Sequence, residues 1–206
     1  MKWRDPEEAR SRLFELATGQ AGSFTAKQAL EAGYSRRLQH YHTKRGHWLR
    51  IDRGIYRLRD FPGSRFEDLV RWTLWSRGKA VVSHDTAASV HELGDIMAGR
   101  IHLTVGADFR KPVPPGVVLH RAWLGVRDLE EGSGFRMTTP LRTLVDLFLA
   151  HMETDRLATA IQSALDRGRI RWPQLEAAFA SLGEEHQEGA DRLLSIVRER
   201  EGVLAV

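Results

Sequence analysis

The chain has 206 residues, of which 42 % are hydrophobic, and carries 31 Lys and Arg against 27 Asp and Glu. This is enough to bury the core of one large domain or two small ones, so a fibrous or disordered chain is excluded. The longest nearly apolar stretch, Leu144 to Ala150, contains Asp146 and is far shorter than the roughly 18 to 20 residues that a bilayer span needs. The start lacks the apolar run of a signal peptide. We therefore expect a soluble, cytoplasmic protein with no membrane partner.

Two residue types are missing from the chain, and their absence limits its chemistry. Without cysteine there are no disulfides, thiolate nucleophiles, zinc ribbons or iron–sulfur clusters. Without asparagine there is no N-glycosylation. Only 5 of the 31 basic residues are lysine. This excess of arginine has two explanations, phosphate recognition and a GC-rich coding genome.

The positive charge lies at the start of the chain. The first 60 residues hold 13 Lys and Arg against 7 Asp and Glu, a net charge of +6, and the remainder therefore carries −2 of the total of +4. Between residues 34 and 59 there are eight basic residues and one acidic residue, Asp52. A basic segment of this kind favours an anionic partner.

Three short helices are predicted within this basic segment and just before it. Arg4 to Ala17 has helical spacing behind Pro6 and two glutamates. Thr25 is a plausible N-cap for a helix over 26–32 that ends at Gly33. Ser35 begins a third helix that runs to Gly46. The order of short helices and glycine turns predicts a helix-turn-helix.

A basic hairpin is predicted to follow these helices. If Arg53 and Gly54 form the turn between 48–52 and 55–59, Ile51 lies opposite Tyr56 and Leu49 opposite Leu58 on one face. Arg50 and Arg57 then share the other face, where like charges repel unless an anion is near. Three helices and a basic hairpin predict a winged helix.

After Phe61 the sequence becomes mixed α and β. We expect domains at 1–62 and 63–206, and an α+β fold in which an N-terminal winged helix-turn-helix precedes a mixed α/β domain with a helical tail. Strands are expected at 80–82, 101–105, 117–122 and 134–137. Helices are expected at 65–77, 85–93, 140–150, 154–167, 173–182 and 189–200, with breaks at Gly168, Gly183 and Gly189.

The third helix has the features of a DNA-reading helix. Duplex DNA presents dense phosphate charge and a major groove that admits one α-helix. We expect Arg36, Arg37 and His40 at base edges and Lys44 and Arg45 at phosphates, whereas Leu38 and His42 point towards the body of the domain. The full set of candidate DNA-binding residues is Ser35, Arg36, Arg37, His40, Tyr41, Lys44, Arg45, Arg50, Arg53 and Arg57. The alternative is a solvated face on a structural helix.

Several motifs together resemble the AbiEi antitoxin family. They occur in order from about residue 11 to residue 150, and the last fifty residues carry no match. The motifs are Tyr34-Ser35, Tyr41 to Gly46, Trp48 to Ile51, Arg53 to Leu58, Val81 to Ala88, His91 to Leu93, Ile101 to Val105 and Thr138 to Asp146.

This resemblance implies a bacterial antitoxin and transcriptional regulator of a type IV toxin–antitoxin (abortive infection) system. Its winged helix would bind inverted repeats of double-stranded DNA in its own promoter and repress the operon. Its second domain would counter a nucleotidyltransferase toxin without a tight complex. Self-association is a further candidate interaction. The alternative is a stand-alone repressor whose second domain dimerises or senses a ligand, with no toxin partner.

Enzyme motifs are missing from the sequence. The metalloprotease pattern fails because His91-Glu92 is followed by Leu-Gly-Asp. No acidic residue stands two positions before a lysine, as a restriction-type nuclease needs, and no Asp-x-Asp follows Gly-Ser, as a nucleotidyltransferase needs. A phosphate-binding glycine loop is also missing. We expect no catalysis, metal or cofactor, and we interpret Arg142 and Asp146 as an i,i+4 pair.

One enzymatic alternative remains, a site around His84, Asp85 and His91 that would hold a divalent metal. The structural interpretation is that His84 and Asp85 begin a helix whose alanines pack inward. His102 and His120 are expected on strands, as packing or hydrogen-bonding residues.

Overall fold

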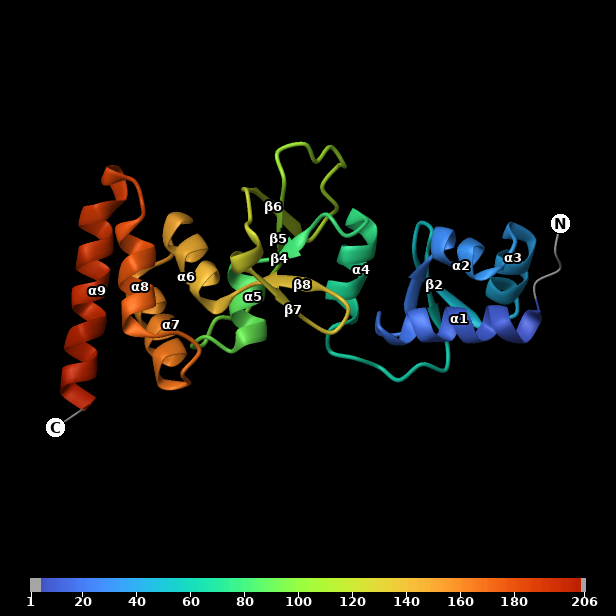
Figure 1. The fold of residues 1–206 in the computed structure, drawn as a ribbon, viewed down its shortest axis with the longest axis horizontal. Helices are drawn as coiled ribbons and strands as arrows, with labels where there is room; N and C mark the ends of the chain where they lie inside the picture. Colours follow the sequence, from blue (N-terminus) through green and yellow to red (C-terminus); the bar gives the residue numbers. More distant parts are fainter. Residues whose placement is uncertain (1–4, 205–206) are drawn as a thin grey trace. The chain divides into compact units, whose positions relative to one another are not determined.

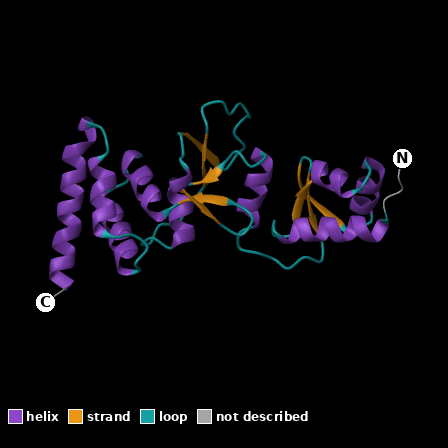
Figure 2. Cartoon of the chain, viewed as in Figure 1, coloured by secondary structure: helices purple, strands orange, loops and turns teal. Residues whose placement is uncertain are grey.

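The computed structural model describes residues 5–204. It divides into two units: the first runs to Ala80 and includes Glu131–Arg136, and the second comprises Val81–Glu130 and the chain from Met137 onward. Each unit has its own sheet (Figures 1 and 2). The expected fold class, α+β with an N-terminal winged helix, is confirmed.

The first unit is built in the order of a winged helix-turn-helix. Its elements are α1 (Pro6–Thr18), β1 (Ser23–Thr25), α2 (Ala26–Ala32), α3 (Arg36–Lys44), β2 (Trp48–Asp52), β3 (Ile55–Leu58) and α4 (Glu67–Ser76). The predicted first residue of the first helix, Arg4, lies outside the described residues. The strands form an antiparallel sheet in the order β1-β3-β2. Strand β1 was not predicted, because three residues are too few for an alternating pattern.

Capping residues fix the two helices of the helix-turn-helix. The Thr25 side chain accepts a hydrogen bond from the Gln28 backbone, and the Gln28 side chain accepts one from the Thr25 backbone, which together form a capping box. Gly33, at φ 117°, ends α2 in the left-handed region that glycine tolerates best. Ser35 caps α3 by accepting from the backbone of Leu38.

A small aromatic core holds this unit together. Phe24 is fully buried and meets Trp48 edge to face, with ring centroids 4.8 Å apart. The other buried members are Leu13, Ala17, Ala29 and Ala32. They come from α1 and α2, so both helices pack on the sheet through this core.

The hairpin register differs from the expected one. Arg50 pairs with Tyr56 and Leu49 with Arg57, and the pairing shifts between Arg50 and Asp52. The irregularity adds one residue to β2, which moves Arg57 out of the predicted pair with Arg50. Arg50 and Arg57 therefore do not share a basic face.

The second unit joins a five-stranded mixed sheet to a helical tail. The strand order is β6-β5-β4-β8-β7, with β5 parallel to β6, β4 antiparallel to β5 and β4 parallel to β8. Its elements are β4 (Val81–Val82), α5 (His84–His91), β5 (Ile101–Val105), β6 (Val117–Arg121), η1 (Val126–Asp128), β7 (Leu129–Glu131), β8 (Arg136–Thr138), α6 (Pro140–Leu149), α7 (Thr154–Asp166), α8 (Trp172–Ala180) and α9 (Glu184–Leu204).

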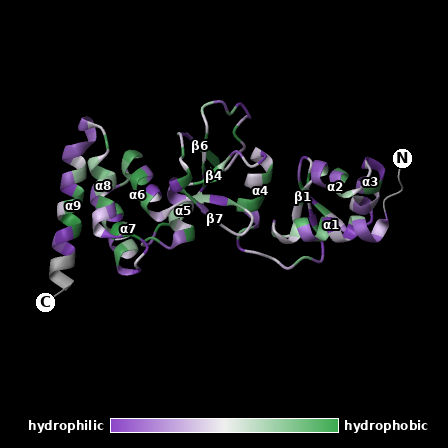
Figure 3. Cartoon of the chain, in the orientation of Figure 1, coloured by the Kyte–Doolittle hydropathy of each residue, from purple (hydrophilic) through white to green (hydrophobic). Residues whose placement is uncertain are grey.

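The tail helices pack through one hydrophobic cluster. Leu144 of α6, Ile161 of α7, Phe179 of α8 and Val197 of α9 are fully buried in it, and Figure 3 shows hydrophobic residues on α6 and α7. The expected break at Gly189 is wrong, because α9 continues through it. A Cβ there would lie 3.4 Å from the Phe148 ring, so α9 passes close to this aromatic side chain at Gly189.

No helix within residues 5–204 combines the length and the apolar character that crossing a bilayer requires.

Two leucines on α6 provide a test of this packing. Leu144→Ala should lower the free energy of unfolding by about 2 to 5 kcal/mol, because it leaves a cavity in the cluster. Leu149→Ala on the same helix removes a side chain that is 38 % exposed and should cost much less. Urea denaturation of both variants measures the difference, and equal losses would contradict the cluster.

Candidate functional site

The candidate nucleic-acid interface is the outer face of α3. Ser35, Arg36, Arg37, His40, Tyr41, Lys44 and Arg45 are all exposed. Within the described residues, no carboxylate forms an ion pair with Arg36, Arg37, Lys44 or Arg45. The Arg45 guanidinium lies 5.6 Å from the centre of the Tyr41 ring, within cation–π range. Figure 3 shows hydrophilic colouring along α3.

Gln39 holds the inner face of α3 against the rest of the helix-turn-helix. Its side chain is 5 % exposed, and its amide nitrogen donates to the carbonyls of Ala26 at 3.1 Å and Tyr34 at 3.0 Å. A buried amide with two backbone partners fixes both position and rotation, because losing either partner would leave a polar group unsatisfied. Gln39 therefore determines which face of α3 looks outward.

The buried residue on the inner face of α3 is Gln39, one position after the residue that the sequence predicts. Leu38, expected to point towards the domain, is 44 % exposed, and Gln39 takes the buried position. His42 is half-buried, as expected. The spacing of Gln39, His42 and Thr43 marks this face, since positions three and four apart share one side of a helix. The sequence favours Leu38 for the buried position because leucine is apolar, whereas the buried residue is the polar Gln39.

The wing presents two of its three candidate arginines to solvent. Arg50 and Arg53 are exposed, and Gly54 makes the turn at φ 71°. Asp52 accepts from the Arg53 backbone at 2.6 Å and from the Arg71 side chain at 3.1 Å. The Arg53 hydrogen bond and, to a smaller extent, Arg71 hold the pKa of Asp52 below its usual value, although burial opposes them. Asp52 thus ties the base of the turn to α4.

Arg57 does not belong to the exposed surface, which corrects the expectation that it faces outward. The residue is 8 % exposed, and its guanidinium pairs with Glu67 at 2.8 Å. It also donates to the carbonyls of Phe61 at 2.8 Å and Pro62 at 3.0 Å. A guanidinium with three internal acceptors anchors the segment after the wing and is not available to a ligand in this arrangement.

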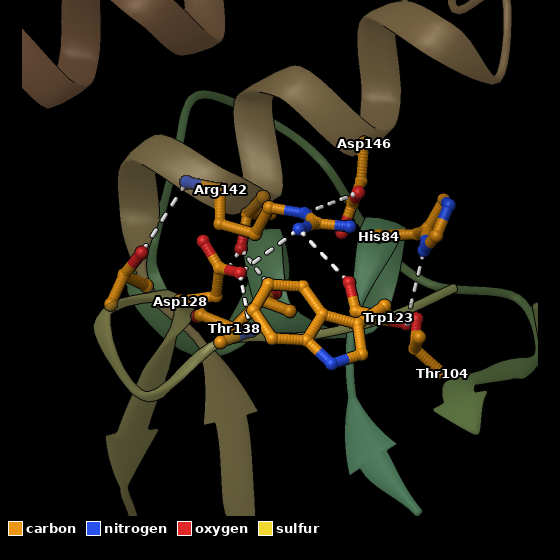
Figure 4. Close-up of polar contacts among 11 residues, drawn as sticks. His84, Thr104, Trp123, Asp128, Thr138, Arg142 and Asp146 are labelled. Atoms are coloured by element: carbon orange, nitrogen blue, oxygen red, sulfur yellow. Dashed lines mark hydrogen bonds and ion pairs between the residues drawn. The ribbon is translucent and has the colours of Figure 1, made fainter. Parts of the chain in front are cut away.

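A second polar group lies in the second unit around Arg142 (Figure 4). The Arg142 side chain donates to Asp146 at 2.8 Å and to Asp128 at 3.1 Å. Burial raises the pKa of Asp146, although the hydrogen bond from Arg142 opposes the rise. The sequence predicted the Arg142 and Asp146 pair, but not Asp128, which comes from η1. The pair is part of a half-buried network that joins α6 to the segment before β7.

Three histidines meet beside this network. His84 is 7 % exposed, adopts a left-handed backbone at φ 49°, and stacks on His120 with ring centroids 3.4 Å apart. The Nδ1 of His102 and the Nε2 of His120 are 3.1 Å apart, so one donates to the other. The register of β5 and β6 places both on one side of the sheet. The sequence placed them on strands but did not predict that they meet.

The chemistry of this histidine cluster is that of neutral, packed rings. Burial, with smaller contributions from His120, His102 and Arg142, lowers the pKa of His84 to about 3. His84 Nδ1 lies 3.0 Å from the Ser83 hydroxyl, which in turn accepts from Thr104 at 2.8 Å, and Ser83 is fully buried. A buried serine is out of reach of a substrate. Within residues 5–204, no group of three His, Asp or Glu side chains is arranged to hold a metal ion.

His91, the third member of the metal alternative, is engaged elsewhere. Its Nε2 lies 2.8 Å from the Thr138 carbonyl, and the residue is 2 % exposed. Thr138 also bonds to Thr143 through their hydroxyls at 2.7 Å. His91 therefore ties α5 to the last residue of β8.

Comparison with known proteins finds one family that matches part of the first unit. Residues 11–59 match the family described as a transcriptional regulator, AbiEi antitoxin, in agreement with the resemblance found from the motifs. No curated protein sequence matches the chain significantly. A crystal structure of the Rv2827c protein from Mycobacterium tuberculosis is similar, with a TM-score of 0.46, 17 % identity, and coverage of 94 % of this chain and 83 % of that one. Similarity at this level carries no functional conclusion.

The anchoring role of Gln39 leads to a stability prediction. Gln39→Ala should lower the free energy of unfolding by about 1 to 3 kcal/mol, because two backbone carbonyls lose their buried donor. His40→Ala, one residue along on the exposed face, is the control and should change stability by less than about 0.5 kcal/mol. Chemical denaturation compares the two variants. If Gln39→Ala were as stable as the control, Gln39 would not anchor α3.

The histidine cluster predicts a pH dependence of stability. His84 has a folded pKa of about 3 against an ordinary value near 6.5, so the unfolded chain binds more protons between these values. Its contribution to stability is present above about pH 6.5 and is lost as the pH falls towards 3, with a slope of up to about 1.4 kcal/mol per pH unit.

Asparagine is the substitution that tests this dependence, because it does not titrate and tolerates a positive φ. Denaturation curves between pH 7 and pH 5 should show a shallower loss of stability for His84→Asn than for the unchanged chain. His40→Asn, which alters an exposed histidine, should keep the full slope. Identical slopes for His84→Asn and the unchanged chain would show that His84 does not titrate in this way.

Proposed function

We propose that this chain, whose residues 11–59 are those of an AbiEi-type transcriptional regulator, binds duplex DNA through α3 and its wing and represses its own operon. The observation that carries the proposal is the exposed cationic face of α3, with four basic side chains that no described carboxylate neutralises. A solubilising face would interleave acidic residues, and α3 contains none.

The position of each side chain along α3 suggests its role. Arg36 and Arg37 occupy the first turn, the part of a recognition helix that lies deepest in the major groove. Their guanidinium groups suit bidentate contact with guanine, and His40 lies one turn further along. Lys44 and Arg45 stand at the other end, where phosphates of the groove edge come within reach.

The wing supplies backbone contacts in this proposal. Arg53 at the tip and Arg50 on β2 are exposed and directed to solvent, and they would reach phosphates or the minor groove. Arg57 is left out of the interface because its guanidinium is bound internally. Asp52 is paired with Arg71, so the single acidic residue of the hairpin does not oppose an approaching phosphate.

The second unit has the antitoxin role in this proposal, acting against a nucleotidyltransferase toxin without forming a tight complex with it. Support comes from the motifs between residues 81 and 146, which resemble the AbiEi family. The family match itself covers residues 11–59, which lie in the first unit. Co-expression with a nucleotidyltransferase encoded beside this chain tests the antitoxin role: growth should be restored, and continued arrest would favour the stand-alone repressor.

The DNA-binding proposal is tested by a gel shift on the DNA upstream of the chain's own gene. Replacing Arg36 and Arg37 with alanine should weaken binding by about 10- to 100-fold, since one bidentate base contact contributes about 1 to 3 kcal/mol. The thermal midpoint should hardly change, because both side chains are exposed.

A charge-matched control separates specific contacts from net charge. Arg156→Ala with Arg169→Ala removes two exposed arginines from the second unit and should leave the gel shift nearly intact. Affinity for the unchanged chain should also fall steeply with salt, because several phosphates are neutralised. Equal weakening by both double variants, or an affinity that ignores salt, would contradict the proposal.

A further inference from the structure

The first unit contains an open pocket of about 580 Å³ on the inner side of α3. This volume lies within the roughly 300 to 1,000 Å³ typical of small-molecule sites. The pocket is lined by α1, by the end of α3 and the turn after it, and by the segment that follows β3. Its lining includes Arg10, Phe14, Tyr34, His42, Trp48 and Phe61.

Planar rings make up much of the pocket wall. His42 lies parallel to Trp48 with centroids 5.0 Å apart, and Tyr34 tilts against the same Trp48 at 5.0 Å. Phe14 and Phe61 form a second aromatic pair at 6.3 Å, and Phe14 is 54 % exposed although it is large and apolar. Walls of this kind select a flat aromatic ligand, which can stack on or meet the rings edge to face.

The polar groups of the pocket favour a negative charge on that ligand. Arg10 forms no ion pair with any described residue and lies close enough to Tyr34 to lower its pKa, against a larger rise caused by burial. The Tyr34 hydroxyl therefore stays protonated and can donate. Arg59 is a second cation, although its guanidinium already donates to the Gly46 carbonyl. Asp60 is the acidic residue of the lining, so the arginines outnumber it.

At least one of the two histidines of the pocket is neutral. The Nδ1 atoms of His42 and His47 are 3.2 Å apart, so one must be an acceptor and therefore neutral at that nitrogen. Burial, and to a smaller extent His47, lowers the pKa of His42. His42 belongs to α3, so whatever occupies the pocket touches the inner face of the helix whose outer face is the proposed DNA interface.

We propose that this pocket binds a planar aromatic carboxylate, with its ring against Phe14 and Phe61 and its carboxylate held by Arg10 and the Tyr34 hydroxyl. Binding is measured on the free protein, so its outcome does not depend on whether the chain binds DNA.

Calorimetric titration of the full chain with 2-naphthoate tests the pocket. Naphthoate should bind at least tenfold more tightly than neutral 2-naphthamide, because an ionic hydrogen bond is lost with the charge. It should also bind more tightly than decahydronaphthalene-2-carboxylate, which has the charge but not the flat ring. Arg10→Gln should weaken naphthoate binding about tenfold or more, and Tyr34→Phe should weaken it by a smaller factor.

Arg12→Gln is the matched control, since Arg12 is an exposed arginine of α1 that pairs with Glu8 and does not line the pocket. It should bind naphthoate like the unchanged chain. Nuclear Overhauser effects between the naphthoate protons and the Phe14 and Phe61 rings should locate the ligand. Absence of binding at millimolar naphthoate, equal binding of the amide, equal binding by Arg10→Gln, or contacts to other residues would overturn the proposal.

Discussion

The hydrogen bonds of the Gln39 amide are the constraint on which the proposed DNA interface depends. A short helix with a strongly basic face gains little from its own sequence, since helices of this length are marginal without tertiary packing. Gln39 fixes α3 to the carbonyls of Ala26 and Tyr34, so the rotation of the helix is set from within. The arginines of α3 are then exposed without needing any partner of their own.

The hairpin is also held by internal ion pairs, which leave two of its arginines exposed. Arg57 of β3 pairs with Glu67, and Asp52 of β2 pairs with Arg71. Both partners belong to α4. These ties place the strands, and they leave Arg50 and Arg53 as the exposed cations of the wing. In the second unit, polar atoms of buried histidines and of Arg142 also join separate elements: His91 bonds to Thr138, and Arg142 bonds to Asp128.

The sequence predicted the elements that local chemistry specifies. Thr25, Gly33 and Ser35 are caps and turns whose effect is confined to their neighbours, and the helices they bound were predicted nearly residue for residue. The sequence-based predictions were wrong where contacts between residues far apart in the chain determine the structure. The irregularity of β2 separates Arg57 from Arg50, and α9 continues through Gly189, where the sequence predicts a break.

The candidate site was predictable to the same extent. The exposed side chains of α3 follow from charge and helical period, whereas the choice of Gln39 over Leu38 as the buried residue depends on which carbonyls lie opposite. The meeting of His84, His102 and His120 requires the parallel pairing of β5 with β6, which no local pattern contains. The aromatic pocket likewise needs α1 and the segment after β3 to be brought together.

Amide hydrogen exchange of the full chain, with and without its own upstream DNA, would show whether α3 contacts the duplex. Exchange should slow on DNA binding in peptides that cover residues 35–45 and the wing turn at 52–55, and it should change little in the second unit. Unchanged exchange over 35–45, or protection confined to residues beyond 80, would contradict the proposed DNA interface.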